Sequence, residues 1–241
     1  MSEPGPKASV PSAAASSPPS GSVPWRDLGT LLVAGLVLSA WYYGIASRQV
    51  ETALLDLFGV TAPESDARWR PVLWATSSGL LFFVPAALWV RVGLGRRLAS
   101  CGMTWPLPSS LRHHARLFGA LALLLGLVFL VSGTPEFRRV YPLGQGWLWL
   151  IAYAAHFVGI EFFFRGLLLF PFEARHGVGA ILIATLPYAM THFQKPPLEA
   201  LASLPAGLLM ASVALNTRSI WPGATLHIAV AISMEIATAP S

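Results

Sequence analysis

Glutamate and histidine side chains that could activate a water molecule occur within apolar stretches of this chain. Glu161 precedes Arg165 by four residues in the apolar run 147–170, so on a helix both side chains share one face, about 40° apart around the axis. His192 and His227 belong to two later apolar runs. One carboxylate and two imidazoles on three helices are sufficient to bind a water, take its proton and stabilise a developing oxyanion.

Two other interpretations of the same residues stay open. Glu161, His192 and His227 could instead hold a zinc ion with water as the fourth ligand, although the chain contains no HExxH pattern. Glu161 and Arg165 could also form a buried ion pair that only fixes one helix against another. Each histidine taken alone fits an ordinary histidine of a helical core.

The distribution of ionisable groups favours chemistry over a purely structural role. A charged side chain at the centre of a bilayer costs about 3 kcal/mol even on lenient scales, so it is retained for a partner or a function. The polar groups gather in the apolar runs of the C-terminal half, and the first three runs contain none of them. They are Glu161, Arg165, His156, His192, His227 and Glu235, with Glu199 near the edge of a run.

Composition identifies a membrane protein. The chain has 241 residues, of which 54% are hydrophobic and only 11% charged, whereas soluble domains carry about 25% charged residues. The mean hydropathy is +0.60. The net charge of +5 is explained by arginines that set topology and meet lipid head groups, and no basic stripe predicts nucleic-acid binding. The single cysteine, Cys101, excludes an internal disulfide.

Hydropathy predicts an all-α, polytopic membrane bundle of about seven transmembrane helices. Residues 1–24 contain thirteen Pro or Ser residues and are expected to form a disordered tail, whereas residues 25–241 form the membrane-embedded domain. A short interfacial helix is expected between the first two spans. The predicted spans are 28–45, 71–90, 117–131, 147–170, 177–192, 198–215 and 219–236.

Loop charge predicts the orientation. Residues 91–116 hold five arginines and no acidic residue, so by the positive-inside rule this loop faces the cytoplasm, as does the N-terminal tail. A composition rich in Ala, Arg and Gly with two lysines is typical of a bacterium. We therefore expect an integral protein of the bacterial inner membrane, with membrane lipids as its surroundings.

The C-terminal half resembles a known family over residues 146–237. The run GIEFFFRG is similar to the first motif of the CAAX-processing and bacteriocin-processing intramembrane proteases (CPBP, Abi or type II CAAX endopeptidases), in which two glutamates precede an arginine. Tyr188 followed by His192 resembles the second motif, an aromatic residue four positions before a histidine. His227, after the small residues 222–224, resembles the third.

The resemblance implies an intramembrane endopeptidase that hydrolyses a membrane-associated or lipid-modified peptide with a glutamate-activated water and without an expected cofactor. Catalytic roles carry over to Glu161, His192 and His227, and supporting roles to Arg165 and Tyr188. The sequence departs from the pattern at two positions, and Glu235 could partly replace one of the missing polar groups. Ile160 stands where the first glutamate belongs, Ala231 stands where the third motif has Asn or Asp, and Glu235 lies about 80° round the helix from His227.

Two further functions remain as alternatives. With Ile160 and Ala231 in the motifs, the chain could be a non-catalytic family member that binds a membrane partner without cutting it. A proton-coupled transporter would use Glu161, His156 and His192 as a relay. The sequence contains no internal repeat of the kind found in many transporters, which does not favour that alternative.

Overall fold

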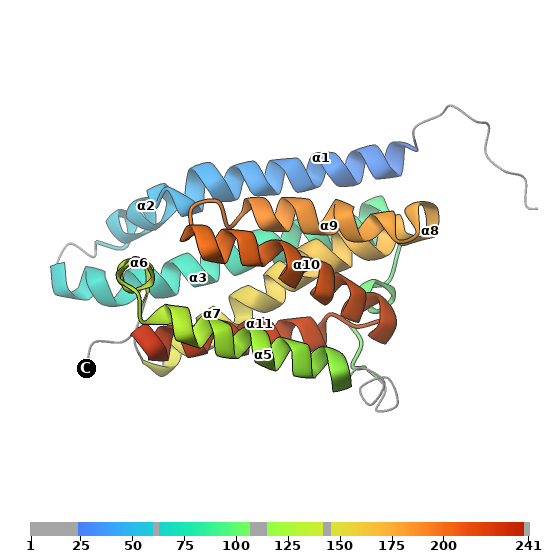
Figure 1. Cartoon of the computed structure of the whole chain (residues 1–241). Coiled ribbons are helices and arrows are strands. Elements are labelled where there is room, and N and C mark those ends of the chain that lie inside the picture. The colour runs from blue at the N-terminus through green and yellow to red at the C-terminus, as the bar shows by residue number, and fades with distance from the viewer. Residues whose placement is uncertain (1–23, 60–62, 107–114, 142–145, 239–241) are drawn as a thin grey trace, which may run out of the picture.

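The structure is a computed structural model that describes residues 24–59, 63–106, 115–141 and 146–238. These residues form helices and no strand, arranged as an elongated bundle (Figure 1). The predicted tail lies outside the described residues, apart from Pro24. The helices are α1 (Trp25–Ala40), η1 (Trp41–Ala46), α2 (Gln49–Leu57), α3 (Pro63–Leu88), η2 (Trp89–Gly93), η3 (Leu98–Cys101), α5 (Ala115–Ser132), α6 (Pro135–Val140), α7 (Trp147–Glu161), η4 (Phe162–Leu169), α8 (Phe170–His176), α9 (Gly179–Met190), α10 (Pro197–Thr217) and α11 (Trp221–Thr238).

The polytopic helical bundle predicted from hydropathy is confirmed. A helix occupies each of the seven predicted spans, and α2 is the short helix expected after the first. Within the described residues, four helical stretches are long and apolar enough to cross a membrane, and α9 is a shorter apolar helix. The four stretches are Trp25–Ala46, Trp69–Gly93, Trp147–His176 and Pro197–Thr217.

Two boundaries differ from the prediction because short polar segments continue or form helices. The second long helix begins at Pro63 rather than at residue 71, since Pro71 lies inside it without ending it. Residues 135–140, expected as part of a loop, form α6 with Pro135 in its first turn, a position where proline has no hydrogen bond to lose.

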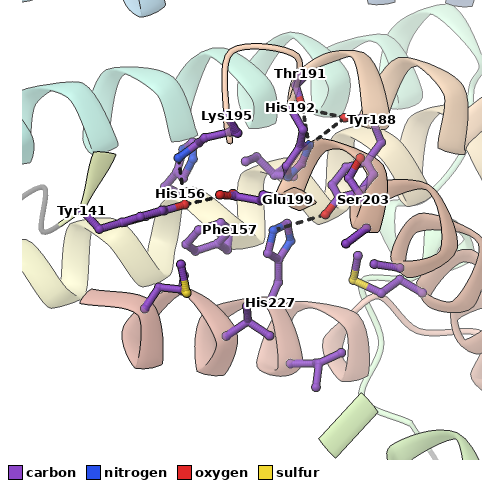
Figure 2. A pocket seen from close by; sticks show the side chains of 18 of the residues that line it. Tyr141, His156, Phe157, Tyr188, Thr191, His192, Lys195, Glu199, Ser203 and His227 are labelled. Atoms are coloured by element: carbon purple, nitrogen blue, oxygen red, sulfur yellow. Dashed lines mark hydrogen bonds between the residues drawn. The ribbon is translucent and has the colours of Figure 1, made fainter. Parts of the chain in front are cut away.

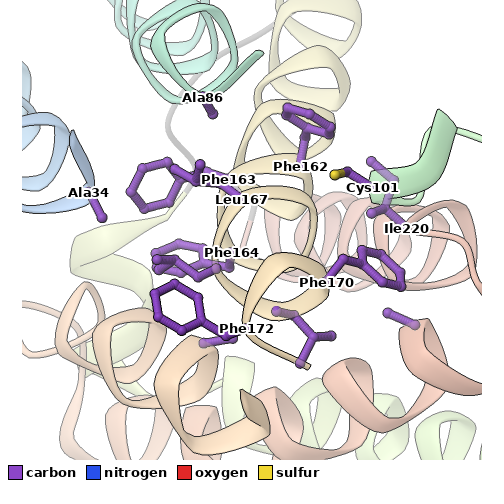
Figure 3. Packing of buried hydrophobic residues seen from close by; sticks show 14 of the residues in the cluster. Ala34, Ala86, Cys101, Phe162, Phe163, Phe164, Leu167, Phe170, Phe172 and Ile220 are labelled. Carbon is purple, nitrogen blue, oxygen red and sulfur yellow. The ribbon is translucent and has the colours of Figure 1, made fainter. Parts of the chain in front are cut away.

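The centre of the fold is one continuous helical stretch made of α7, η4 and α8. Its middle part, η4, is π-helical and all eight of its residues are buried. Phe162, Phe163 and Phe164 are each 0% exposed and point to different neighbours in the core (Figure 3). Because aromatic side chains surround η4, the residue that precedes it, Glu161, is enclosed within the bundle.

Small residues let the surrounding helices approach this central stretch. A Cβ on Gly159 of α7 would lie 2.5 Å from the carbonyl oxygen of Gly79 on α3, so these two backbones are in contact. A Cβ on Gly207 of α10 would lie 2.8 Å from Thr185 and 3.0 Å from Tyr188, both on α9. Close packing at glycine is the usual way in which membrane helices associate. These contacts hold α3 against α7 and α10 against α9.

Candidate active site

A cavity of about 490 Å³ lies inside the bundle. Side chains of α3, α7, α10 and α11 and of the turn after α9 line it, and most of them are apolar (Figure 2). Ligand sites in proteins are typically apolar cavities with a few polar groups that fix orientation. The polar groups of this cavity are therefore the candidates for chemistry.

His192 and His227, the two histidines singled out in the sequence, both line this cavity. The ring of Tyr188 contacts both, with its centroid 4.7 Å from that of His192 and 5.8 Å from that of His227. Nδ1 of His192 lies 3.1 Å from the backbone oxygen of Tyr188, while the Tyr188 hydroxyl lies 3.5 Å from Nε2 of His227. His192 follows α9 rather than lying within it, and the Tyr188 backbone still directs its ring inward.

Glu161 contacts His227 from behind the cavity. Its Oε1 lies 3.0 Å from Nδ1 of His227 and accepts a hydrogen bond of 3.0 Å from the guanidinium of Arg165. The Glu161 residue is 0% exposed and is not one of the residues that line the cavity. A Cβ on Gly223 of α11 would lie 2.8 Å from Oε2, so this oxygen packs against the helix that carries His227. The structure thus brings Glu161 to His227 but not to the cavity surface.

Arg165 links Glu161 to Tyr188. Its guanidinium carbon lies 4.7 Å from the centroid of the Tyr188 ring, and the residue is 1% exposed. An arginine that is both paired with a carboxylate and stacked on an aromatic ring is held in a defined orientation. Arg165, Glu161 and Tyr188 therefore form a connected support for His227.

Both positions at which the sequence departs from the family pattern lie on the cavity surface. Ile160 of α7 and Ala231 of α11 line the cavity together with His192 and His227. The positions of all three motifs therefore converge on one cavity. Two of those positions carry apolar side chains in this chain.

Tyr141, Lys195 and Glu199 form a second polar cluster on the cavity surface, apart from the histidines. The sequence did not predict this cluster. The hydroxyl of Tyr141 donates to Oε1 of Glu199 over 3.0 Å, and the ammonium of Lys195 donates to the Tyr141 hydroxyl over 2.8 Å (Figure 2). Burial raises the pKa of Tyr141 well above its ordinary value, and the pKa of Lys195 is lowered by burial, against the opposing effect of Glu199 and then Glu235. The position of Glu199 near the edge of an apolar run was its one sequence signal.

Glu235 and the zinc alternative can be compared with this arrangement. Glu235 is buried on α11, and its charge acts on Lys195 and on Tyr141. Among the residues that the structure describes, no three His, Cys, Asp or Glu side chains are grouped closely enough to hold a metal ion.

Comparison with known proteins agrees with the geometry. Residues 142–233 match the model of the family described as Rce1-like, type II CAAX prenyl endopeptidase. No curated protein and no solved structure matches the chain. The matched segment contains Tyr188, His192 and His227, which line the cavity, and Glu161 and Arg165, which lie behind His227. The chain is an integral membrane protein, and its segment 142–233 is similar to the CAAX-processing protease family.

Proposed function

We propose that this protein is an intramembrane endopeptidase that hydrolyses a peptide bond of a membrane-associated or lipid-modified peptide. The single observation that carries the proposal is the Glu161–His227 contact beside a cavity that His192 also lines. The similarity of residues 142–233 to the type II CAAX prenyl endopeptidase family supports the reaction class. The apolar cavity surface fits a substrate that enters from the lipid phase, and a water activated by a glutamate is the nucleophile.

His227 acts on the scissile peptide bond in this proposal. Its Nδ1 is engaged with Oε1 of Glu161, and the contact is an ion pair whenever the imidazole is protonated. Nε2 is then the nitrogen available to polarise the carbonyl and to donate to the oxyanion that forms on attack. His192, which lines the same cavity, holds the water or the same oxyanion.

Glu161 has a positioning role in this proposal, not direct contact with the water. One of its oxygens is shared by Arg165 and His227, the other packs against Gly223, and the residue is not among those that line the cavity. By accepting the Nδ1 hydrogen bond, Glu161 fixes the orientation of the His227 ring, as a carboxylate does in other histidine-dependent hydrolases.

The test is peptide cleavage by the purified protein in liposomes. The substrates are fluorogenic peptides with a farnesylated cysteine three residues before the C-terminus, and the same peptides without the lipid. We expect cleavage by the wild type and a loss of at least about 100-fold in Glu161→Ala. Glu136→Ala, at an exposed glutamate of α6, is the matched control and should retain activity. Full activity of Glu161→Ala would remove the assigned role.

A non-catalytic family member is the second candidate, because the two positions that depart from the pattern, Ile160 and Ala231, both line the cavity. Such a protein would bind the farnesylated peptide and leave it intact, which mass spectrometry of the recovered peptide would show. The proton-relay alternative predicts a proton flux across the liposome membrane that depends on Glu161.

The cellular setting belongs to the same proposal. We place the protein in a bacterial inner membrane, with the N-terminus and the arginine-rich loop 91–116 on the cytoplasmic side. Its partners are then membrane lipids and a peptide or protein substrate at that membrane. Protease accessibility of an N-terminal tag in right-side-out and inverted vesicles tests the orientation.

A further inference from the structure

The cavity surface carries a carboxylate that belongs to none of the three motifs. Glu199 lies in the first turn of α10 and is the only Asp or Glu among the described residues that line the cavity. Ile160, at the position of the absent motif glutamate, presents an apolar side chain to the same space. A hydrolytic reaction in this cavity therefore has one carboxylate within direct reach.

Glu199 is held in a fixed orientation through one of its oxygens. Oε1 accepts the hydroxyl proton of Tyr141, and the same hydroxyl accepts from the Lys195 ammonium. The ammonium also lies 4.3 Å from the centroid of the Tyr141 ring. The Tyr141 hydroxyl donates a hydrogen bond to Glu199 and accepts one from Lys195. Because the hydroxyl is held in this way, the carboxylate of Glu199 cannot rotate freely.

The other oxygen of Glu199 is left for a ligand. Oε2 is buried and has no hydrogen-bond partner within the described part of the chain. A buried carboxylate oxygen without a donor carries a desolvation penalty, which a bound water relieves. A carboxylate fixed through one oxygen and open through the other has the geometry of a general base.

Glu161 also has a buried Oε2 without a hydrogen-bond partner among the described residues, but it differs from Glu199 in its surroundings. Its Oε1 is shared by two donors, its Oε2 packs against Gly223, and it lies outside the cavity surface. The two glutamates therefore differ in access to the cavity, although only Glu161 lies in a motif.

We infer that Glu199 is the general base that activates the hydrolytic water, an inference that rests on the proposed endopeptidase function. Oε2 of Glu199 takes one proton from the water as the water oxygen bonds to the scissile carbonyl carbon, and the carbonyl oxygen becomes an oxyanion beside His227 and His192. The oxyanion collapses, the C–N bond breaks, and the proton held by Glu199 passes to the departing amine nitrogen. Glu199 returns to its carboxylate form, and one water has been consumed.

The experiment uses the full-length protein in liposomes with the farnesylated peptide as substrate. Glu199→Gln preserves the shape of the side chain and an acceptor for Tyr141 but removes the base. We expect kcat to fall at least about 100-fold with KM changed less than about threefold. Glu136→Gln is the matched control, and binding of the farnesylated peptide to each variant verifies that the cavity remains formed.

Chemical rescue distinguishes a base from a positioning residue. In Glu199→Ala, a small carboxylate or azide in the buffer can occupy the vacated space, and we expect formate or azide to raise kcat about tenfold. Glu161→Ala should be inactive and unchanged by either anion, because its space lies behind His227. Glu199→Asp, which keeps a carboxylate at a longer distance, should retain part of the activity.

The outcomes separate the two proposals. A wild type that cuts the peptide together with a Glu199→Gln variant of near wild-type kcat overturns the inference and leaves the endopeptidase function standing. Rescue of Glu161→Ala but not of Glu199→Ala also overturns it. A wild type that binds the peptide and cuts none of it overturns both.

Discussion

Oε1 of Glu161 and Nδ1 of His227 lie 3.0 Å apart although 66 residues separate them in the chain. The contact joins the end of α7 to the middle of α11, and it places an imidazole on the cavity with a buried carboxylate behind it. The pair is also the buried end of a short network, since Arg165 donates to the same oxygen.

Arg165→Met should destabilise the protein strongly, because it leaves the Glu161 carboxylate buried without its cation. Breaking such a pair from one side costs about 3–5 kcal/mol. The double variant Glu161→Met/Arg165→Met should regain most of the lost free energy of unfolding, since neither charge is then left alone, but should stay inactive. Unfolding in mixed micelles measures the first effect and peptide cleavage the second. A single variant as stable as the wild type would show that the pair contributes little.

Gly223→Ala should displace the Glu161 carboxylate. The added Cβ would meet Oε2 at 2.8 Å, and relief by moving the carboxylate would lengthen its bond to His227. We expect a loss of about 1–3 kcal/mol in stability and a marked fall in kcat. Gly35→Ala on α1 is the control, because a Cβ there meets nothing within 4 Å. Equal behaviour of the two variants would contradict the close packing described for Gly223.

Much of the fold could be predicted from hydropathy alone, because each apolar run is long enough to define a helix. The prediction was wrong at Pro71, because α3 continues through this proline. It was also wrong at residues 135–140, which were expected to form a loop and form the short helix α6. A single sequence carries no signal for the close contact between Gly79 and Gly159, since it depends on how two helices cross.

The site was predictable only in part, for a physical reason. Glu161, His192 and His227 stand out because charged or polar groups are rare in apolar runs. Whether a side chain faces the cavity or lies behind it depends on helix rotation, and periodicity does not place Glu161 behind His227. Glu199 was passed over because its partners, Tyr141 and Lys195, come from segments outside the spans, Tyr141 lying 58 residues away in the chain.

Ile160→Glu should restore a base at the cavity surface. In the Glu199→Gln background we expect the added carboxylate to recover cleavage by about tenfold or more, because residue 160 lines the same cavity as His192 and His227. Ile160→Gln in that background is the matched control, since it adds a polar group of similar size without a base. Recovery by both variants would point to polarity or hydration of the cavity instead of proton transfer.

Gly159→Ala should prevent normal assembly of α3 against α7. Its Cβ would lie 2.5 Å from a backbone oxygen of Gly79, and a backbone atom cannot move aside as a side chain can. We expect little folded protein by size-exclusion chromatography. Gly126→Ala on α5, where a Cβ meets nothing within 4 Å, should be recovered at wild-type yield. A well-folded Gly159→Ala variant would show that α3 and α7 can move apart with little loss of stability.

The contact between Gly159 and Gly79 limits the routes by which the proposed peptide substrate could enter the cavity. The backbones of α3 and α7 are in contact at Gly79 and Gly159. Separating the two helices there would expose main-chain atoms to lipid, which is unfavourable. If the proposed peptide enters the cavity by a movement of helices, we therefore expect α10 and α11, which also line it, to move rather than α3 and α7.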